Sequence, residues 1–148
     1  MSDTPLSGIC VIKFTHMILG PSVSAIFASL GGEAIHGDPI GGHRARTLLG
    51  SAAGCFPAFN RGKQSICLDL KSTDGIAVAK KFIDSTDVLV ENYGPGTMER
   101  LDLDYETLSA TNSRLIYCST KGFLQSSSEQ RSSLDVVAQL MGSLAYMT

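Results

Sequence analysis

The chain has 148 residues, of which 43% are hydrophobic and 18% are charged, and its formal net charge is −2. This composition is typical of one packed domain and excludes a largely disordered chain. Because there is no block of Lys and Arg residues, nucleic acid is not expected as a partner.

No apolar run approaches the length that spans a membrane, and residues 1–8 are too polar and too short for a signal peptide. A membrane is therefore not expected as a partner. The four cysteines are not paired at metal-ligand spacing, and most of them lie in apolar runs where a small buried thiol is common. We expect a cytoplasmic protein without a disulfide framework.

The first half of the chain predicts two strands, a helix and a long excursion. Residues 9–14 form the first expected strand, and Pro21 suits the first turn of a helix that continues to residue 30. A short second strand follows at residues 33–36. Residues 37–59 show no clean period and predict a surface excursion, with a helical turn near residues 47–49; excursions of this length are more often functional than idle.

The second half predicts three more strands, each followed by helical sequence. Strands are expected at residues 65–70, 88–90 and 115–119. Helices are expected at residues 75–84, 97–101, 104–112 and 134–147. This alternation predicts an α/β fold, a Rossmann-like open parallel sheet with flanking helices.

The most informative stretch is the strand at residues 88–90 and the loop that follows it. The strand is continuously apolar, as expected when both faces are covered, and the Gly-Pro-Gly sequence at residues 94–96 forces a sharp turn. Ligands of open α/β sheets bind just beyond the carboxyl ends of the strands. Asn92 and Tyr93 are therefore the first candidates for a ligand site. An ordinary strand-to-helix turn would explain the same residues.

Other candidates lie at the expected strand ends. His16 could be a general base, although a loop histidine that bonds the backbone is the commoner case. Lys71 and Arg100 could meet phosphates, or they could be solvated cations. His36 and His43 lack a third metal ligand at suitable spacing. The first strand is not followed by G-x-G-x-x-G, which disfavours a nicotinamide enzyme.

Taken together, ordered segments along almost the whole chain resemble the class III CoA-transferase family, which includes formyl-CoA transferases, carnitine CoA-transferases and α-methylacyl-CoA racemases. The most distinctive piece is Val-Glu-Asn-Tyr-Gly-Pro-Gly at residues 90–96. The other segments are residues 5–9, 14–17, 20–21, 59–66, 68–71, 99–101, 112–119 and 121–123. Each segment alone would be a weak signal, but the ordered set is specific.

The resemblance implies an enzyme that moves coenzyme A between carboxylic acids, with acyl-CoA and an acid as substrates and no permanently bound cofactor. Lys71 and Arg100 would then hold phosphates, and the loops at Met17 and Asn92 would frame the nucleotide and the thioester arm. Carried over position by position, the CoA contacts would fall at His16, Met17, Ile18, Leu68, Lys71, Asn92, Tyr93 and Arg100.

The family nucleophile is an aspartate that attacks the thioester to give a mixed anhydride and then an enzyme thioester. By family spacing it is expected beyond Thr148, and Asp135 corresponds to a different family aspartate. Racemases use a His where Leu134 stands, so racemase chemistry is disfavoured. The chain also departs from the family at His36, usually Lys or Arg, and at Ser132, where some members place a CoA-binding lysine.

Intact family members are much longer, and their two subunits interlink as homodimers. Residues 1–148 therefore resemble an N-terminal CoA-binding Rossmann-like segment whose second domain is absent. One alternative is a catalytically silent CoA-binding or scaffold fragment that acts with another chain. A further alternative is a nucleotide-binding module unrelated to CoA. The identity of the acid substrates is not expected to be readable from this segment.

Overall fold

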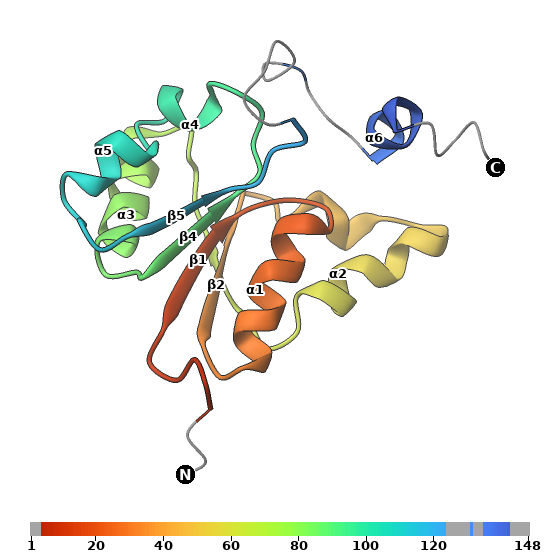
Figure 1. Ribbon diagram of the computed structural model, residues 1–148, viewed down its shortest axis with the longest axis horizontal. Helices are drawn as coiled ribbons and strands as arrows, with labels where there is room; N and C mark the ends of the chain where they lie inside the picture. Colours follow the sequence, from red (N-terminus) through yellow and green to blue (C-terminus); the bar gives the residue numbers. More distant parts are fainter. Residues whose placement is uncertain (1–3, 124–130, 132–134, 143–148) are drawn as a thin grey trace.

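The structure is a computed structural model that describes residues 4–123, 131 and 135–142. Its centre is a five-stranded parallel sheet with the strand order β3-β2-β1-β4-β5 (Figure 1). The strands are β1 (Cys10–Phe14), β2 (Glu33–Asp38), β3 (Gln64–Cys67), β4 (Val88–Glu91) and β5 (Ile116–Ser119). The helices are α1 (Leu19–Ser29), α2 (Cys55–Phe59), α3 (Thr73–Asp84), α4 (Thr97–Arg100), α5 (Tyr105–Ser109) and α6 (Asp135–Met141), with 3₁₀ helices η1 (Arg44–Thr47) and η2 (Gly50–Gly54). The predicted Rossmann-like parallel sheet is confirmed.

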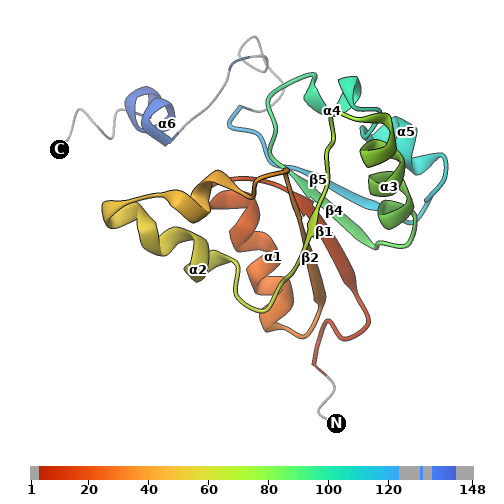
Figure 2. The ribbon, with the colours of Figure 1, turned by 180° about the vertical axis from the view of Figure 1, so that it is seen from behind.

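Helices cover both faces of the sheet, and the central strands are buried on both sides. Figures 1 and 2 show α1 and α2 on one face and α3 and α5 on the other. Val11 and Val90 belong to the apolar cluster on the α1 face, whereas Ile12 and Leu89 belong to the cluster beneath α3 and α5. All four side chains are fully buried, which explains why β1 and β4 read as continuous apolar runs.

The parallel register brings the carboxyl ends of the strands to one edge. Phe14 at the end of β1 pairs with Glu91 at the end of β4, and Glu91 pairs in turn with Ser119 at the end of β5. After β1 the chain enters α1 on one face, and after β4 it passes to α4 on the other side. The junction of β1 and β4 is therefore the topological switch point, where open α/β sheets bind ligands.

Several predicted boundaries are wrong. The third predicted strand extends to residue 70, but β3 ends at Cys67 because the next residues form a turn. In that turn the backbone N–H of Lys71 donates to Asp69 Oδ1 at 3.0 Å. The helical turn predicted near residues 47–49 lies earlier than expected, since Thr47 is the last residue of η1 and Leu48 is extended, and the excursion is helical again at η2 and α2.

The predicted helices lie close to their expected positions. α1 begins two residues before Pro21, which is tolerated because the first N–H groups of a helix have no partner within it. α3 is capped as expected, since the backbone N–H of Gly75 donates to Ser72 Oγ at 3.0 Å. Residues 134 and 143–147 of the last predicted helix lie outside the described residues, and α6 falls within the rest.

A buried polar cluster fastens the excursion to the α1 face of the sheet. Asn60, which follows α2, is its centre. The Oδ1 atom of Asn60 lies 2.9 Å from Lys13 Nζ, 3.2 Å from His36 Nδ1 and 3.4 Å from Lys63 Nζ. The other ring nitrogen of His36, Nε2, lies 3.1 Å from Asp38 Oδ1. A neutral imidazole carries one N–H, so only one of its two contacts is a hydrogen bond in that state.

We call Lys13, His36, Asp38, Asn60 and Lys63 the Asn60 cluster. Asp38 connects this cluster to the excursion and to β3. Its Oδ2 atom accepts from Arg46 Nη2 at 2.6 Å and from Ser65 Oγ at 2.7 Å. The guanidinium of Arg46 also lies 4.1 Å from the ring centre of Phe56. Asp38 and Arg46 therefore hold η1, α2 and β3 at the carboxyl end of β2.

The Asn60 cluster makes stability depend on pH. Burial, with a smaller contribution from Lys63, lowers the pKa of Lys13 to about 7. In the unfolded chain this pKa is about 10.4, so between these values the unfolded chain holds a proton that the folded chain has released. The free energy of unfolding therefore rises with pH through this window. Burial also lowers the pKa of Lys63 to about 8, which acts in the same direction.

We expect the Lys13→Met variant to show a smaller rise in unfolding free energy between pH 7 and pH 8.5 than the parent chain. The substitution removes the group that titrates in this range and keeps an unbranched side chain in its place. Urea denaturation at a series of pH values measures this slope. Lys81→Met, an exposed position on α3, is the matched control and should keep the parent slope. Equal slopes in Lys13→Met and the parent chain would contradict the assignment.

Candidate functional site

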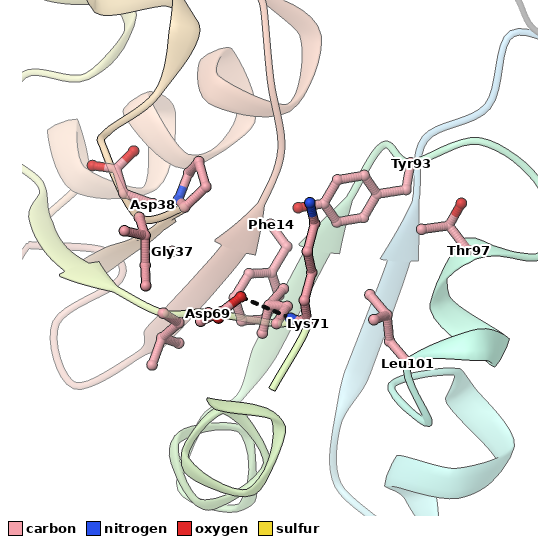
Figure 3. A pocket seen from close by; sticks show the side chains of 12 residues that line it. Phe14, Gly37, Asp38, Asp69, Lys71, Tyr93, Thr97 and Leu101 are labelled. Carbon is pink, nitrogen blue, oxygen red and sulfur yellow. Dashed lines mark hydrogen bonds between the residues drawn. The ribbon is translucent and has the colours of Figure 1, made fainter. Parts of the chain in front are cut away.

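A pocket of about 550 Å³ opens at the carboxyl edge of the sheet, on the face that α3 and α4 cover (Figure 3). Its walls are largely apolar and come from the ends of four strands and from α4. The lining residues are Phe14, Gly37, Asp38, Pro39, Ile40, Leu68, Asp69, Leu70, Lys71, Tyr93, Thr97 and Leu101. Three ionisable side chains line it: Asp38, Asp69 and Lys71. Asp38 Oδ2 is paired with Arg46 and Asp69 Oδ1 accepts from the backbone N–H of Lys71, so Lys71 is the cation that could meet an anionic extension of a flat apolar ligand.

Three of the eight sequence-predicted contacts line this pocket. Leu68 is 7% exposed and forms part of its floor, and Lys71 and Tyr93 are directed into it in Figure 3. Burial, and then the charge of Glu91, raise the pKa of Tyr93, so its hydroxyl stays protonated at neutral pH and can donate a hydrogen bond. The pocket therefore offers one cation and one neutral donor, beside the carboxylates of Asp38 and Asp69.

His16 and Asn92 meet at the topological switch point. Asn92 Oδ1 accepts from the backbone N–H of His16 at 2.9 Å, and Asn92 Nδ2 donates to the backbone carbonyl of His16 at 2.9 Å. Both polar atoms of the Asn92 side chain are thus used to hold the loop after β1. Asn92 is a positioning group in this arrangement, and the imidazole of His16 remains available.

The imidazole of His16 lies beside the aromatic ring of Tyr93, with ring centres 6.0 Å apart. Burial lowers the pKa of His16, so the ring is neutral at pH 7 and acts as a donor or an acceptor rather than as a cation. The Tyr93 ring therefore lies between the pocket, which it lines, and the imidazole of His16 at the switch point.

Met17 and Ile18 continue the loop after β1 at the surface. Met17 has φ 62°, in the left-handed region that a non-glycine residue rarely adopts, and its side chain is 52% exposed. Ile18 is 45% exposed. Strained backbone of this kind persists only where the surroundings hold it and is often found at functional sites.

Arg100 lies beside the pocket without lining it. Its Nη2 atom donates to Thr97 Oγ1 at 2.9 Å, and Thr97 is one of the pocket residues. Glycine is favoured at Gly96 chiefly by its backbone, and the nearest atom that a Cβ would meet is the movable end of the exposed Arg100 side chain. The φ of Gly96 is +71°, and a Cβ atom there would lie 3.1 Å from Arg100 Nη1. The Gly-Pro-Gly turn therefore sets the position of Arg100 at the rim.

The sequence analysis did not identify two groups of residues around the site. The apolar walls formed by Phe14, Leu70 and Leu101 were assigned only to two strands and a helix, because an apolar side chain in a pocket has the same sequence pattern as one in the core. The second group is the ion pair of buried Glu91 with the partly exposed Lys121, which supports the Tyr93 loop. A carboxylate at the end of an apolar strand is the sequence signal for this pair.

In the part of the chain that the structure describes, no group of three or more His, Cys, Asp or Glu side chains could hold a metal ion. No helix among these residues is long and apolar enough to cross a membrane. Asp135 belongs to α6, and Ser132 lies outside the described residues.

Residues 6–148 match the model of CoA-transferase family III. The chain is 41% identical over 125 residues to acetyl-CoA:oxalate CoA-transferase of Acetobacter aceti, which covers 82% of this chain and 32% of that protein. It is 36% identical over 147 residues to formyl-CoA:oxalate CoA-transferase of Streptomyces coelicolor, covering 96% of this chain and 36% of that protein. The human succinyl-CoA:glutarate CoA-transferase is 31% identical over 150 residues, with coverages of 97% and 34%.

Solved structures also superpose closely on this chain. Rv3272 from Mycobacterium tuberculosis superposes with a TM-score of 0.90 at 32% identity, covering 95% of this chain and 40% of that chain. A CAIB/BAIF family protein from Brucella suis superposes with a TM-score of 0.88 at 33% identity and the same coverages. The chain spans about a third of the length of the curated relatives described above. On these matches, which run through nearly every described strand and helix, the chain belongs to CoA-transferase family III.

Proposed function

We propose that residues 1–148 form the CoA-binding part of an acyl-CoA:carboxylate CoA-transferase. The observation that carries this proposal is the apolar pocket at the carboxyl edge of the sheet, which has Lys71 in its wall and Arg100 at its rim. The relatives described above are all named as CoA-transferases, which supports the same function.

The proposed binding mode assigns each end of coenzyme A to a part of the site. The adenine would lie in the pocket against the apolar walls at Leu68 and Tyr93. Lys71 and Arg100 would pair with phosphate groups, because each is an exposed cation next to the pocket. The thioester arm would then cross the switch point along the loop that Asn92 holds at His16.

In the proposed reaction this chain binds and orients the acyl-CoA, and a carboxylate supplies the nucleophile. As the family resemblance implies, an aspartate attacks the thioester carbonyl, a mixed anhydride forms and the CoA thiolate leaves. The thiolate attacks the aspartyl carbonyl of the anhydride, which gives an enzyme thioester and releases the first acid. The acceptor carboxylate attacks this thioester to give a second mixed anhydride, and the expelled thiolate attacks its acyl carbonyl, which forms the new acyl-CoA and restores the aspartate. The proposal places this aspartate beyond Thr148, in a cytoplasmic protein that acts as a homodimer when full length.

The binding mode predicts that Lys71→Ala and Arg100→Ala each weaken CoA binding by about tenfold or more. A hydrogen bond to a charged group contributes about 1.5–3 kcal/mol, and 1.4 kcal/mol corresponds to a factor of ten in the dissociation constant. Isothermal titration calorimetry of the 148-residue chain with CoA measures this change. Lys81→Ala, an exposed lysine on α3, is the matched control and should bind CoA as the parent chain does.

Unchanged affinity in both variants would remove the phosphate roles of Lys71 and Arg100. Titration with ATP and NAD provides a second comparison. Binding of either nucleotide as tightly as CoA would contradict the proposal and would favour a nucleotide-binding module unrelated to CoA.

The proposed place of the nucleophile predicts that the chain binds acyl-CoA without forming a covalent adduct. Intact-mass spectrometry after incubation with succinyl-CoA measures this. After the free cysteines have been blocked by alkylation, a mass increase that hydroxylamine removes would reveal an anhydride or thioester on a carboxylate and would show that the nucleophile lies within residues 1–148. Acylation of surface lysines resists hydroxylamine, which separates it from that result. CoA binding without an adduct also agrees with a silent CoA-binding part that acts with another chain.

A further inference from the structure

Glu91 is a buried carboxylate that the proposed reaction does not use. Its side chain is 1% exposed at the end of β4, directly before the loop that carries Asn92 and Tyr93. Oε2 accepts from the backbone N–H of Tyr93 at 2.8 Å, and Oε1 accepts from Lys121 Nζ at 2.8 Å and from the hydroxyl of Ser119. Such a buried carboxylate needs donors of this kind, because an unpaired charge in the interior is strongly destabilising.

Lys121 completes a closed set of contacts around Tyr93. Besides its ion pair with Glu91, its Nζ atom donates to the backbone carbonyl of Tyr93 at 2.9 Å. The backbone N–H of Tyr93 is thus held by Glu91, and its carbonyl is held by Lys121. Both main-chain groups lie past the end of β4, where the sheet no longer provides partners for them.

The contacts of the Glu91 side chain are not needed to join β4 to β5. The two strands pair along their whole length, and Thr120 donates to the Glu91 carbonyl from its backbone N–H and from its hydroxyl, each at 2.9 Å. The specific effect of the buried carboxylate is therefore to fix the main chain of Tyr93. Asn92 precedes Tyr93 and holds the loop at His16. Fixing the main chain of Tyr93 therefore also helps to fix the position of Asn92 and, through it, the loop at His16.

We propose that Glu91 and Lys121 are positioning residues that hold the Asn92–Tyr93 loop in the conformation that binds CoA. We call this pair the Glu91–Lys121 clamp. The inference rests on the proposed function, since Tyr93 and His16 are taken there as CoA contacts. Neither clamp residue needs to touch CoA, and the clamp acts through Tyr93 and Asn92.

The test compares CoA affinity with stability in Lys121→Met, which removes the charge and the donors but keeps an unbranched side chain. This variant is expected to bind CoA about tenfold more weakly than the parent chain in calorimetry. Lys121→Arg, which restores a cationic donor, is expected to return the affinity to within about threefold. Glu91→Gln gives a second measurement of the same contact. Because the Lys121 side chain is 33% exposed, its variants are the ones expected to fold normally.

Asn112→Ala is the control for a purely structural effect. Asn112 is 7% exposed, and its Nδ2 atom donates to the carbonyls of Ile83 and Thr86 at 3.0 and 2.8 Å, before β5 and at the amino end of the sheet. Its removal is expected to lower the melting temperature and to leave CoA affinity unchanged. A second readout is hydrogen exchange at the Tyr93 amide without CoA, which Lys121→Met should accelerate and Asn112→Ala should not.

The outcomes separate the clamp from the proposed function. A parent chain that does not bind CoA would overturn the proposed function and the clamp with it. A parent chain that binds CoA, together with a Lys121→Met variant that binds equally tightly and protects the Tyr93 amide equally well, would overturn the clamp alone. Equal losses of affinity in Lys121→Met and Asn112→Ala would also overturn it, because the effect would then follow stability.

Discussion

The parallel pairing of β1 with β4 is the constraint on which the rest of the site depends. It places Phe14 opposite Glu91, so the two strands end together while their chains leave toward opposite faces. The gap that opens between the departing loops is closed by the two hydrogen bonds between Asn92 and the backbone of His16. The pocket lies next to this junction because β2 and β3 end at the same edge and add their own turns to it.

Two buried polar systems support this edge, one on each face of the sheet. On the α1 face, the Asn60 cluster holds the excursion against the end of β2. On the other face, Glu91 and Lys121 hold the chain that leaves β4. Apolar contacts are non-directional and would leave these loops free to shift, whereas hydrogen bonds and ion pairs around a buried group define one arrangement. Both systems lie directly behind residues that line the pocket or approach it.

The sequence predicted the strands well, because apolar runs are local patterns, and of the proposed site residues it placed Lys71 and Tyr93 where the structure has a pocket. Apolar runs identified β1 and β4, and residues after strand ends identified Lys71, Asn92 and Tyr93. The early end of β3 was missed because Leu68 continues the apolar run, although Asp69 forms the turn that ends the strand. The role of Lys13 was also missed, since its contact with Asn60 joins residues 47 positions apart and has no local signature.

The outer strands have a consequence for handling the protein. In the part of the chain that the structure describes, β3 and β5 form the two edges, and neither Gln64–Cys67 nor Ile116–Ser119 contains a charged residue. Ile116 is also 64% exposed beside the unpaired backbone of β5. Proteins usually protect such strands with charges or proline, because bare edges recruit further strands. We therefore expect concentrated preparations to associate edge to edge, and we expect Ile116→Lys to reduce this association.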